Sequence, residues 1–392
     1  MNIRMIDTEP MLDALVQELE SAGELAFDVE ADGLFRYRAN LCMVQVATRD
    51  VLAVIDTIAI KNHAKLAPLF ERQQPLKVVH DASFDARMLR DVGLPLVRMF
   101  DTSIAARFLG EQQAGLATLL EKRMGVVVTK EYQKADWGRR PITPEQLNYL
   151  ANDVRYLLGL ADILREELRA KSIEQEVDEE CAYLLRRAAS EQVEIRPAWT
   201  RVKGAVDLAG PSKAVLRELC IAREEEAEAR DVPSFKVITN ESLLTIARKR
   251  PKTMQDLTRD VGPNALRVHQ FATRIMRAIR DGEARGGVPP EDLAPSGGPI
   301  PTPEERAAAK IRDRSLSAWR RAMATERGVD PQAVLPGHCF HEIVALNPSA
   351  PEELSAIDGV GTFRIERDGA AIIAALHAPP PPILPPQDPA QP

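Results

Sequence analysis

The chain has 392 residues, of which 45% are hydrophobic, 28% charged and 5% aromatic, and its formal net charge is −7 at pH 7. This length suffices for two or three domains with buried cores, and no apolar run approaches the ~18 residues that a membrane-spanning helix needs. Met1 leads into acidic residues instead of a signal-peptide core, so we expect a cytoplasmic protein without a membrane partner. The four cysteines are far apart, which indicates neither a zinc site nor a disulfide framework.

Charge is unevenly distributed along the chain. Residues 201–285 hold 17 Lys and Arg against 12 Asp and Glu, whereas residues 1–170 hold 21 against 25. An acidic front half with a basic module behind it is what a metal-dependent enzyme acting on a polyanion needs. Uneven surface charge without any partner remains an alternative, so charge alone does not decide.

The first 170 residues predict a helix, three closely connected strands, and then alternating strands and helices. Apolar residues recur at helical spacing over residues 10–21. Residues 25–29, 41–48 and 51–55 are predicted strands with short connections, which favours an antiparallel start. Further strands are predicted at residues 77–80 and 99–101, and helices at residues 63–71, 83–92, 102–109, 116–124 and 144–169. Such alternation indicates an α/β layer architecture.

Two carboxylates stand one residue apart at the end of the first predicted strand, in Asp28-Val29-Glu30. Side chains of a strand alternate between its faces, so Asp28 and Glu30 project from the same face. Because adjacent anions repel, a cation between them is one explanation for the pair. The alternative is a strand that runs into an acidic turn with both carboxylates solvated, and so short a motif does not decide between them.

Three further polar residues on predicted helices are candidates for the same site. Asp85 lies early in the helix after the 77–80 strand, whereas Asp81 lies in the preceding turn and is better placed as a cap. Tyr149 and Asp153 are four residues apart and therefore share one helix face. Each also has an ordinary explanation, since a first-turn acid offsets the helix dipole and a Tyr/Asp pair at this spacing packs beside solvent.

Taken together, these motifs resemble the DEDD superfamily of 3′-to-5′ exonucleases, in the subgroup with a tyrosine in the last motif, and within it the ribonuclease D family. The resemblance is carried by Asp28-Val29-Glu30, residues 80–85, Tyr149 with Asp153, and residues 100–106 and 136–141. It covers residues 1–170 and implies a ribonuclease H-like domain with a mixed sheet. The residue types at Val29 and at positions 31–34 differ from those typical of the family and are more similar to those of relatives that act on DNA.

The resemblance implies a site of four carboxylates, Asp28, Glu30, Asp85 and Asp153. Oxygen ligands select hard cations, so the expected cofactors are two divalent cations, Mg²⁺ or Mn²⁺, without an organic cofactor. The resemblance also implies that Tyr149 orients or helps to deprotonate the attacking water. A phenol pKa of about 10 makes orientation the better match.

Contacts to the substrate are expected from side chains around the carboxylates. Leu34 and Phe84 are candidates to wedge against or stack on terminal bases, with core packing as the alternative. Trp137, Arg139 and Arg140 form an aromatic and basic loop that is a candidate contact for a nucleic acid strand. A tryptophan buried under that loop is the competing interpretation.

Residues 208–283 predict an all-helical module in which two long helices flank shorter ones. Its basic residues are candidate phosphate contacts, with a solvated helix face as the alternative. They are Arg248, Lys249, Arg250, Lys252, Arg267, Arg274, Arg277 and Arg280. Residues 304–376 repeat the helical pattern, and both copies resemble HRDC domains. The second copy is less basic, which favours a brace, although amides at the helix start after Gly361 suit a phosphate.

The expected fold is therefore an α/β exonuclease domain followed by two all-α helical-bundle (HRDC) domains. The predicted extents are residues 1–170 for the exonuclease domain, 171–207 for a helical linker, 208–285 for the first HRDC domain, 286–303 for a Pro/Gly-rich linker, 304–377 for the second HRDC-like domain and 378–392 for a disordered tail. A proline-rich composition is the reason to expect disorder in the tail.

We predict a metal-dependent 3′-to-5′ exoribonuclease that acts as a monomer on RNA 3′ ends, and the resemblance alone implies transfer RNA precursors. One alternative is a DNA exonuclease that uses the same site. Another is a catalytically silent RNA-binding scaffold, against which the presence of all four carboxylates and the tyrosine argues.

Overall fold

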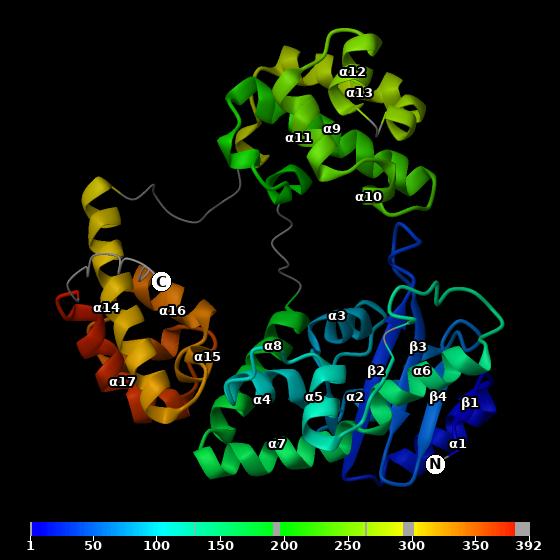
Figure 1. Cartoon of the computed structure of the whole chain (residues 1–392), viewed down its shortest axis with the longest axis vertical. Helices are drawn as coiled ribbons and strands as arrows, with labels where there is room; N and C mark the ends of the chain where they lie inside the picture. The colour runs from blue at the N-terminus through cyan, green and yellow to red at the C-terminus, as the bar shows by residue number, and fades with distance from the viewer. Residues whose placement is uncertain (1, 130, 191–196, 263–264, 293–301, 381–392) are drawn as a thin grey trace, which may run out of the picture.

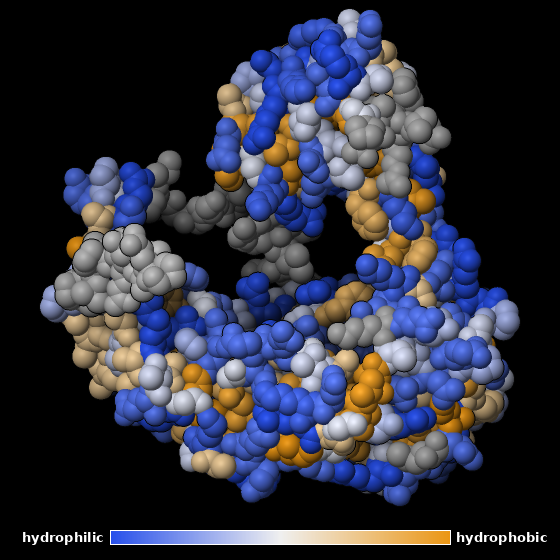
Figure 2. Space-filling model, viewed as in Figure 1, coloured by the Kyte–Doolittle hydropathy of each residue, from blue (hydrophilic) through white to orange (hydrophobic). Residues whose placement is uncertain are grey.

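The computed structural model describes residues 2–129, 131–190, 197–262, 265–292 and 302–380, with the side chains of residues 265–270 left aside. These residues form an N-terminal α/β domain and two helical modules (Figure 1). The fold class expected from the sequence is confirmed. In the part of the chain that is described, no helix is long and apolar enough to span a membrane. Figure 2 shows a largely hydrophilic surface with scattered apolar side chains on this face of the molecule.

A mixed sheet of six strands, in the order β1-β4-β3-β2-β5-β6, forms the centre of the α/β domain. Its strands are β1 (Arg4–Ile6), β2 (Glu24–Ala31), β3 (Leu41–Ala47), β4 (Leu52–Asp56), β5 (Leu76–Val79) and β6 (Met99–Asp101). The strands β2, β3 and β4 pair antiparallel, as predicted, and the other pairs are parallel. The three-residue strand β1 was not predicted.

Helices of the α/β domain follow the predicted order with shifted ends. They are α1 (Glu9–Leu19), α2 (Ala67–Phe70), α3 (Ser83–Asp91), α4 (Thr102–Phe108), α5 (Leu116–Met124), α6 (Pro144–Arg155), α7 (Leu157–Lys171) and α8 (Glu174–Ala189). A capping box of Thr143 and Gln146 starts α6, because each side chain bonds the other's backbone amide. The α6 helix packs across β2, β3 and β4, which places it over the strand that carries Asp28.

The first helical module consists of α9 (Gly210–Ala229), α10 (Ser234–Val237), α11 (Asn240–Lys249), α12 (Met254–Val261) and α13 (Ala265–Arg285). The long helices α9 and α13 pack so closely that a Cβ at Gly282 would lie 2.5 Å from Val215 Cα. A glycine is therefore required at that crossing. Trp199 and Ala205, in the segment predicted as a linker, also pack into this module's core.

The second helical module consists of α14 (Pro303–Arg327), α15 (Pro331–Val334), α16 (Gly337–Leu346), the short 3₁₀ helix η6 (Pro351–Ala356) and α17 (Thr362–His377). A capping box of Thr302 and Glu305 starts α14 well before the apolar pattern at Leu316 begins. Ala324, Val329 and Val334 belong to the hydrophobic core of the α/β domain. The second module is thus packed into the exonuclease fold.

Candidate metal centre

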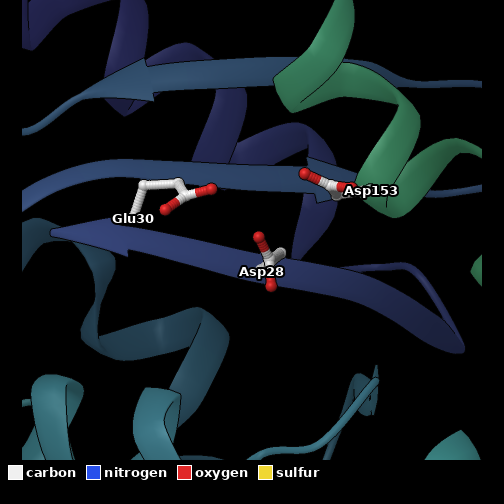
Figure 3. Close-up of side chains that lie close together, drawn as sticks. All are labelled: Asp28, Glu30 and Asp153. Atoms are coloured by element: carbon white, nitrogen blue, oxygen red, sulfur yellow. The ribbon is translucent and has the colours of Figure 1, made fainter. Parts of the chain in front are cut away.

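Three carboxylates from two elements converge beside the sheet. Asp28 and Glu30 project from the same face of β2, as their spacing predicts, and Asp153 reaches them from α6 (Figure 3). One carboxylate oxygen from each residue lies within 4.8 Å of the others. Residues that are 123 positions apart in the chain, Glu30 and Asp153, therefore share one small site.

Each of these three carboxylates has its pKa raised above the ordinary value. For Asp28 and Asp153 the cause is burial, to which Asp28 adds a repulsive charge at Asp153. The pKa of Glu30 is raised by burial and then by the charges of Asp28 and Asp153. Among the described residues none of the three forms an ion pair with Lys or Arg. The arrangement is costly for the protein alone and would be stabilised by a cation.

Asp85 lies in the first turn of α3, only 4% exposed, and its Oδ2 has no hydrogen-bond partner. Burial raises its pKa well above the ordinary value, and the nearby charge of Asp28 adds to this effect. Asp85 is outside the group of three oxygens that lie within 4.8 Å. Asp85 is therefore not part of that group, although the charges of Asp28 and Glu30 both act on it.

The donor set fits hard divalent cations. All four side chains offer carboxylate oxygens, which are the ligands that Mg²⁺ and Mn²⁺ prefer. Within the described part of the chain, Asp85 Oδ2 is buried without a hydrogen-bond partner, and the half-buried Asp28, Glu30 and Asp153 have no cationic side chain as a partner. Bound cations would satisfy all four carboxylates. Three of the four residues chosen from the sequence, Asp28, Glu30 and Asp153, converge in one group, and the place of Asp85 in the ligand set stays a prediction.

Tyr149 lies one helical turn before Asp153 and is 8% exposed. Its ring stacks on that of Trp137, with centroids 6.0 Å apart, and meets Tyr132 edge to face. Burial, followed by the charges of Asp153 and Glu30, raises the pKa of Tyr149. The phenol therefore keeps its proton at neutral pH.

Two of the predicted nucleic-acid contacts have structural roles instead. Trp137 is 1% exposed and lies in the core against Tyr149, so the competing interpretation of a buried tryptophan is the correct one. Arg140 donates two hydrogen bonds to Asp56, at 2.5 and 2.6 Å, and another to the Cys42 carbonyl. Although burial opposes it, this contact holds the pKa of Asp56 below its ordinary value. Arg140 thereby fastens the loop before α6 to β3 and β4.

The other contacts predicted near the carboxylates are exposed. Leu34 and Phe84 have exposed fractions of 44% and 45%, which is high for large apolar side chains, and neither belongs to the core. Arg139 is 84% exposed and forms a local ion pair with Asp136. These three remain predictions for contacts to a substrate strand, and their exposure is compatible with that role.

Most basic residues predicted to bind phosphate in the first module have acidic neighbours. Lys249 pairs with Asp260, Arg250 and Lys252 pair with Glu283, Arg274 pairs with Glu225 and Glu226, and Arg277 pairs with Asp281. Arg248 is exposed, and the side chain of Arg267 lies outside the described residues. The net positive field of this face is therefore weaker than its arginine count suggests.

The amides predicted to bind phosphate after Gly361 are already engaged. The Phe363 amide, at the start of α17, donates to Glu179 Oε1 at 3.0 Å. A Cβ at Gly361 would lie 1.8 Å from that same oxygen. The phosphate site expected there is wrong, because a carboxylate of α8 takes the place of the anion.

Two further polar residues, His80 and Gln45, lie at or near the strands of the sheet. His80 Nδ1 lies 2.9 Å from Thr102 Oγ1, whose hydroxyl donates to the Val79 carbonyl, so His80 is a structural histidine at a strand end. Sequence reasoning missed Gln45 on β3, which is completely buried, unpaired and directly opposite Asp28. A polar residue at the centre of an apolar strand was the signal in the sequence that could have found it.

Known protein families match both parts of this architecture. Residues 3–169 match the model described as 3′-5′ exonuclease, and residues 212–279 and 313–376 match the HRDC domain. The fold and these matches define the class, a 3′-to-5′ exonuclease with two HRDC domains.

Individual relatives narrow this class. The chain is 30% identical over 385 residues to ribonuclease D of Pseudomonas paraeruginosa, covering 96% of this chain and 98% of the relative. It is 32% identical to ribonuclease D of a Shewanella species, covering 73% and 74%. The crystal structure of Escherichia coli RNase D shares the fold, with a TM-score of 0.70 at 23% identity over 96% of this chain and 99% of that one. The chain belongs to the ribonuclease D family and is a 3′-to-5′ exoribonuclease.

Proposed function

We propose that the chain removes nucleotide 5′-monophosphates from RNA 3′ ends by two-metal, in-line hydrolysis at the carboxylate cluster. The observation that carries this proposal is the convergence of Asp28, Glu30 and Asp153 within 4.8 Å without a cationic partner among the described residues. Asp28, Glu30 and Asp153 would hold one cation, and Asp85 with Asp28 would hold the other. When bound, the two cations activate the attacking water and stabilise the leaving 3′ oxygen.

The roles of the remaining residues follow from their environment. Tyr149 keeps its proton, because burial and neighbouring carboxylates raise its pKa, so its Oη orients the attacking water and does not remove the proton. Trp137 and Tyr132 hold the phenol ring in place from two sides. Leu34 and Phe84 contact the terminal bases, which their exposure supports.

We propose RNA 3′ ends as the substrate, with transfer RNA precursors among them, and a monomer as the active form. Support for RNA comes from the relatives named ribonuclease D and from the Escherichia coli structure, which is described as an exoribonuclease involved in structured RNA processing. The choice of transfer RNA rests on family resemblance alone.

The test is degradation of a 5′-labelled RNA with a single-stranded 3′ end, in Mg²⁺ or Mn²⁺ and in EDTA. A ladder that shortens from the 3′ end, releases 5′-monophosphates and stops in EDTA is the expected result. Asp28→Asn should lower the rate by at least about 10³-fold, since the residue would belong to both cation sites. The matched control is Asp50→Asn, which removes the charge of an exposed turn residue and should leave the rate unchanged.

A DNA strand of the same sequence separates the proposal from its main alternative. Faster degradation of the DNA would overturn the assignment to RNA while leaving the metal site intact. Retained RNA binding without any cleavage in either cation would favour the scaffold alternative.

A further inference from the structure

Gln45 is an anomaly within the sheet. It lies on β3, where the other six residues, from Leu41 to Ala47, are buried and apolar. Its exposed fraction is 0%, and neither Oε1 nor Nε2 has a hydrogen-bond partner among the residues that the structure describes. A buried amide without partners costs about 1–3 kcal/mol compared with an apolar residue of the same shape. Stability therefore does not explain why glutamine stands here.

The register of the sheet places Gln45 beside the metal ligands. Gln45 is directly opposite Asp28 across the antiparallel pair of β3 and β2. Directly opposed residues share one face of a sheet, with their Cβ atoms about 4.5–5.5 Å apart. The neighbour on the other side, on β4, is the buried and apolar Val54. Asp28 is thus the polar group nearest to Gln45 across the strands.

Helix α6 covers this face and seals the amide from solvent. Asp153 of α6 meets Asp28 and Glu30, so α6 lies on the face that carries Asp28, and it also packs on β3 and β4. Gln45 is accordingly enclosed between β2, β4 and α6. An amide N–H in such a place is pre-positioned to donate to an ionised carboxylate, and a hydrogen bond to a charged group is stronger than one between neutral groups.

We propose that Gln45 is a positioning residue whose Nε2 donates a hydrogen bond to the Asp28 carboxylate when that carboxylate holds a cation. The hydrogen bond fixes the orientation of Asp28, the residue that the proposed function assigns to both cations. Partners that hydrogen-bond to a metal ligand in this way typically change metal affinity or activity 10–100-fold when they are removed. The inference rests on the proposed function for the identity of the ligands.

The decisive variant is Gln45→Leu, which keeps the volume and removes the amide. Without metal, its unfolding midpoint should rise by about 2–4 °C, because an unsatisfied buried amide is gone. Its dissociation constant for Mn²⁺ should rise by about 10–100-fold, and kcat should fall with little change in KM for RNA. A purely structural glutamine predicts the opposite sign for stability and no change in Mn²⁺ affinity.

Met43→Leu is the matched control. Met43 lies on the same strand and face, directly opposite Glu30, and is also fully buried and replaced by a residue of similar volume. Its Mn²⁺ affinity should equal that of the wild type. Gln45→Met provides a second apolar variant that adapts more easily to the site, and it should show the same loss of affinity if Gln45→Leu does not fold.

Mn²⁺ titration by calorimetry, without RNA, separates the two levels of inference. If the wild type binds no Mn²⁺, both the metal centre and the role of Gln45 are overturned. If the wild type binds and the folded Gln45 variants bind equally well, only the role of Gln45 is overturned. Weaker Mn²⁺ binding together with a raised unfolding midpoint supports the proposal.

Discussion

The two HRDC modules share one helical pattern but are attached to the exonuclease domain in different ways. Both modules have a core of their own, but the second also contributes Ala324, Val329 and Val334 to the exonuclease core, whereas the exonuclease domain adds the partly buried Tyr37 to the core of the first. Two modules of the same fold are therefore attached differently: the second is packed against the catalytic domain, and the first has a smaller contact with it.

Buried charges fix the second module. Arg364 is completely buried and donates to Glu179 Oε2 at 2.8 Å and to the Glu176 carbonyl at 3.2 Å. Nearby, the rings of Tyr183 and His338 stack with centroids 3.7 Å apart. Because Arg364 is removed from water, its contact with α8 tolerates little displacement.

The first module is held by exposed charges. The loop between β2 and β3 extends toward α10 in Figure 1, and its Arg38 pairs with Glu228 at 3.1 Å and its Arg36 with Asp231 at 3.7 Å. The side chains of Arg38 and Glu228 are 83% and 59% exposed. Exposed ion pairs contribute about 0–1 kcal/mol, so this contact is weak and sensitive to salt.

Removal of residues 302–380 should have the largest effect on stability. The exonuclease domain would lose the apolar packing of Val329 and Val334, each worth about 1.5–3 kcal/mol, and expose part of its core. The unfolding midpoint of the remaining chain should fall by about 10 °C in calorimetry. An unchanged midpoint would show that the second module is as independent as the first.

Arg364→Met should destabilise the protein by about 3–5 kcal/mol in urea unfolding, because Glu179, whose side chain is only 16% exposed, loses its cation. Arg186→Met is the matched control, since the pair of Arg186 with Asp358 spans the same interface but is 55% and 53% exposed. The control should cost at most about 1 kcal/mol. Equal losses in the two variants would contradict the distinction between buried and exposed contacts.

Glu180 gives the second module's interface a pH dependence. Burial raises the pKa of Glu180 to about 7, above its ordinary value of 4.5, and the charge of Arg364 opposes this only in part. The folded state therefore binds the proton more tightly, and stability is lost as the pH rises from 4.5 through 7.

Glu180→Gln should match the wild type near pH 4 and exceed its stability at pH 8 by up to about 3 kcal/mol. His338 faces Glu180 at 3.9 Å and its pKa is lowered to about 4 by burial, but it is present in both proteins and cancels to first order. Urea unfolding at the two pH values measures the difference. Glu166→Gln, at an exposed site, should show no comparable change with pH.

Glu228→Lys combined with Asp231→Lys should have the smallest effect on stability, below about 1 kcal/mol, because the contact is exposed. At low salt the first module should nevertheless detach, which small-angle scattering would detect as a larger radius of gyration. Asp207→Lys with Glu241→Lys makes the same charge change on exposed positions of that module and should leave the radius unchanged. In 1 M salt the wild type should approach the radius of the detached variant.

Local patterns predicted the carboxylate cluster because each of its parts is local. Period two along β2 put Asp28 and Glu30 on one face, and a spacing of four on α6 aligned Tyr149 with Asp153. The resemblance of these motifs to one family then indicated that they meet in a single site, although they are far apart in the chain.

Long-range partners account for what the sequence could not show. Arg140 is fastened by Asp56, 84 residues earlier, and the start of α17 is capped by Glu179, 184 residues earlier. The residues next to Arg140 or Gly361 in the sequence do not show whether the guanidinium or the backbone amides there already have a hydrogen-bond partner within the protein. The proximity of Gln45 to Asp28 likewise depends on the pairing of β3 with β2, which the sequence alone does not show.

The carboxylate of Glu179 lies at the start of α17, where it accepts a hydrogen bond from the Phe363 amide. It occupies, from within the chain, the place where an anionic ligand would bind. Copy number is therefore a poor measure of valency: a chain with two HRDC domains does not automatically have two nucleic-acid surfaces.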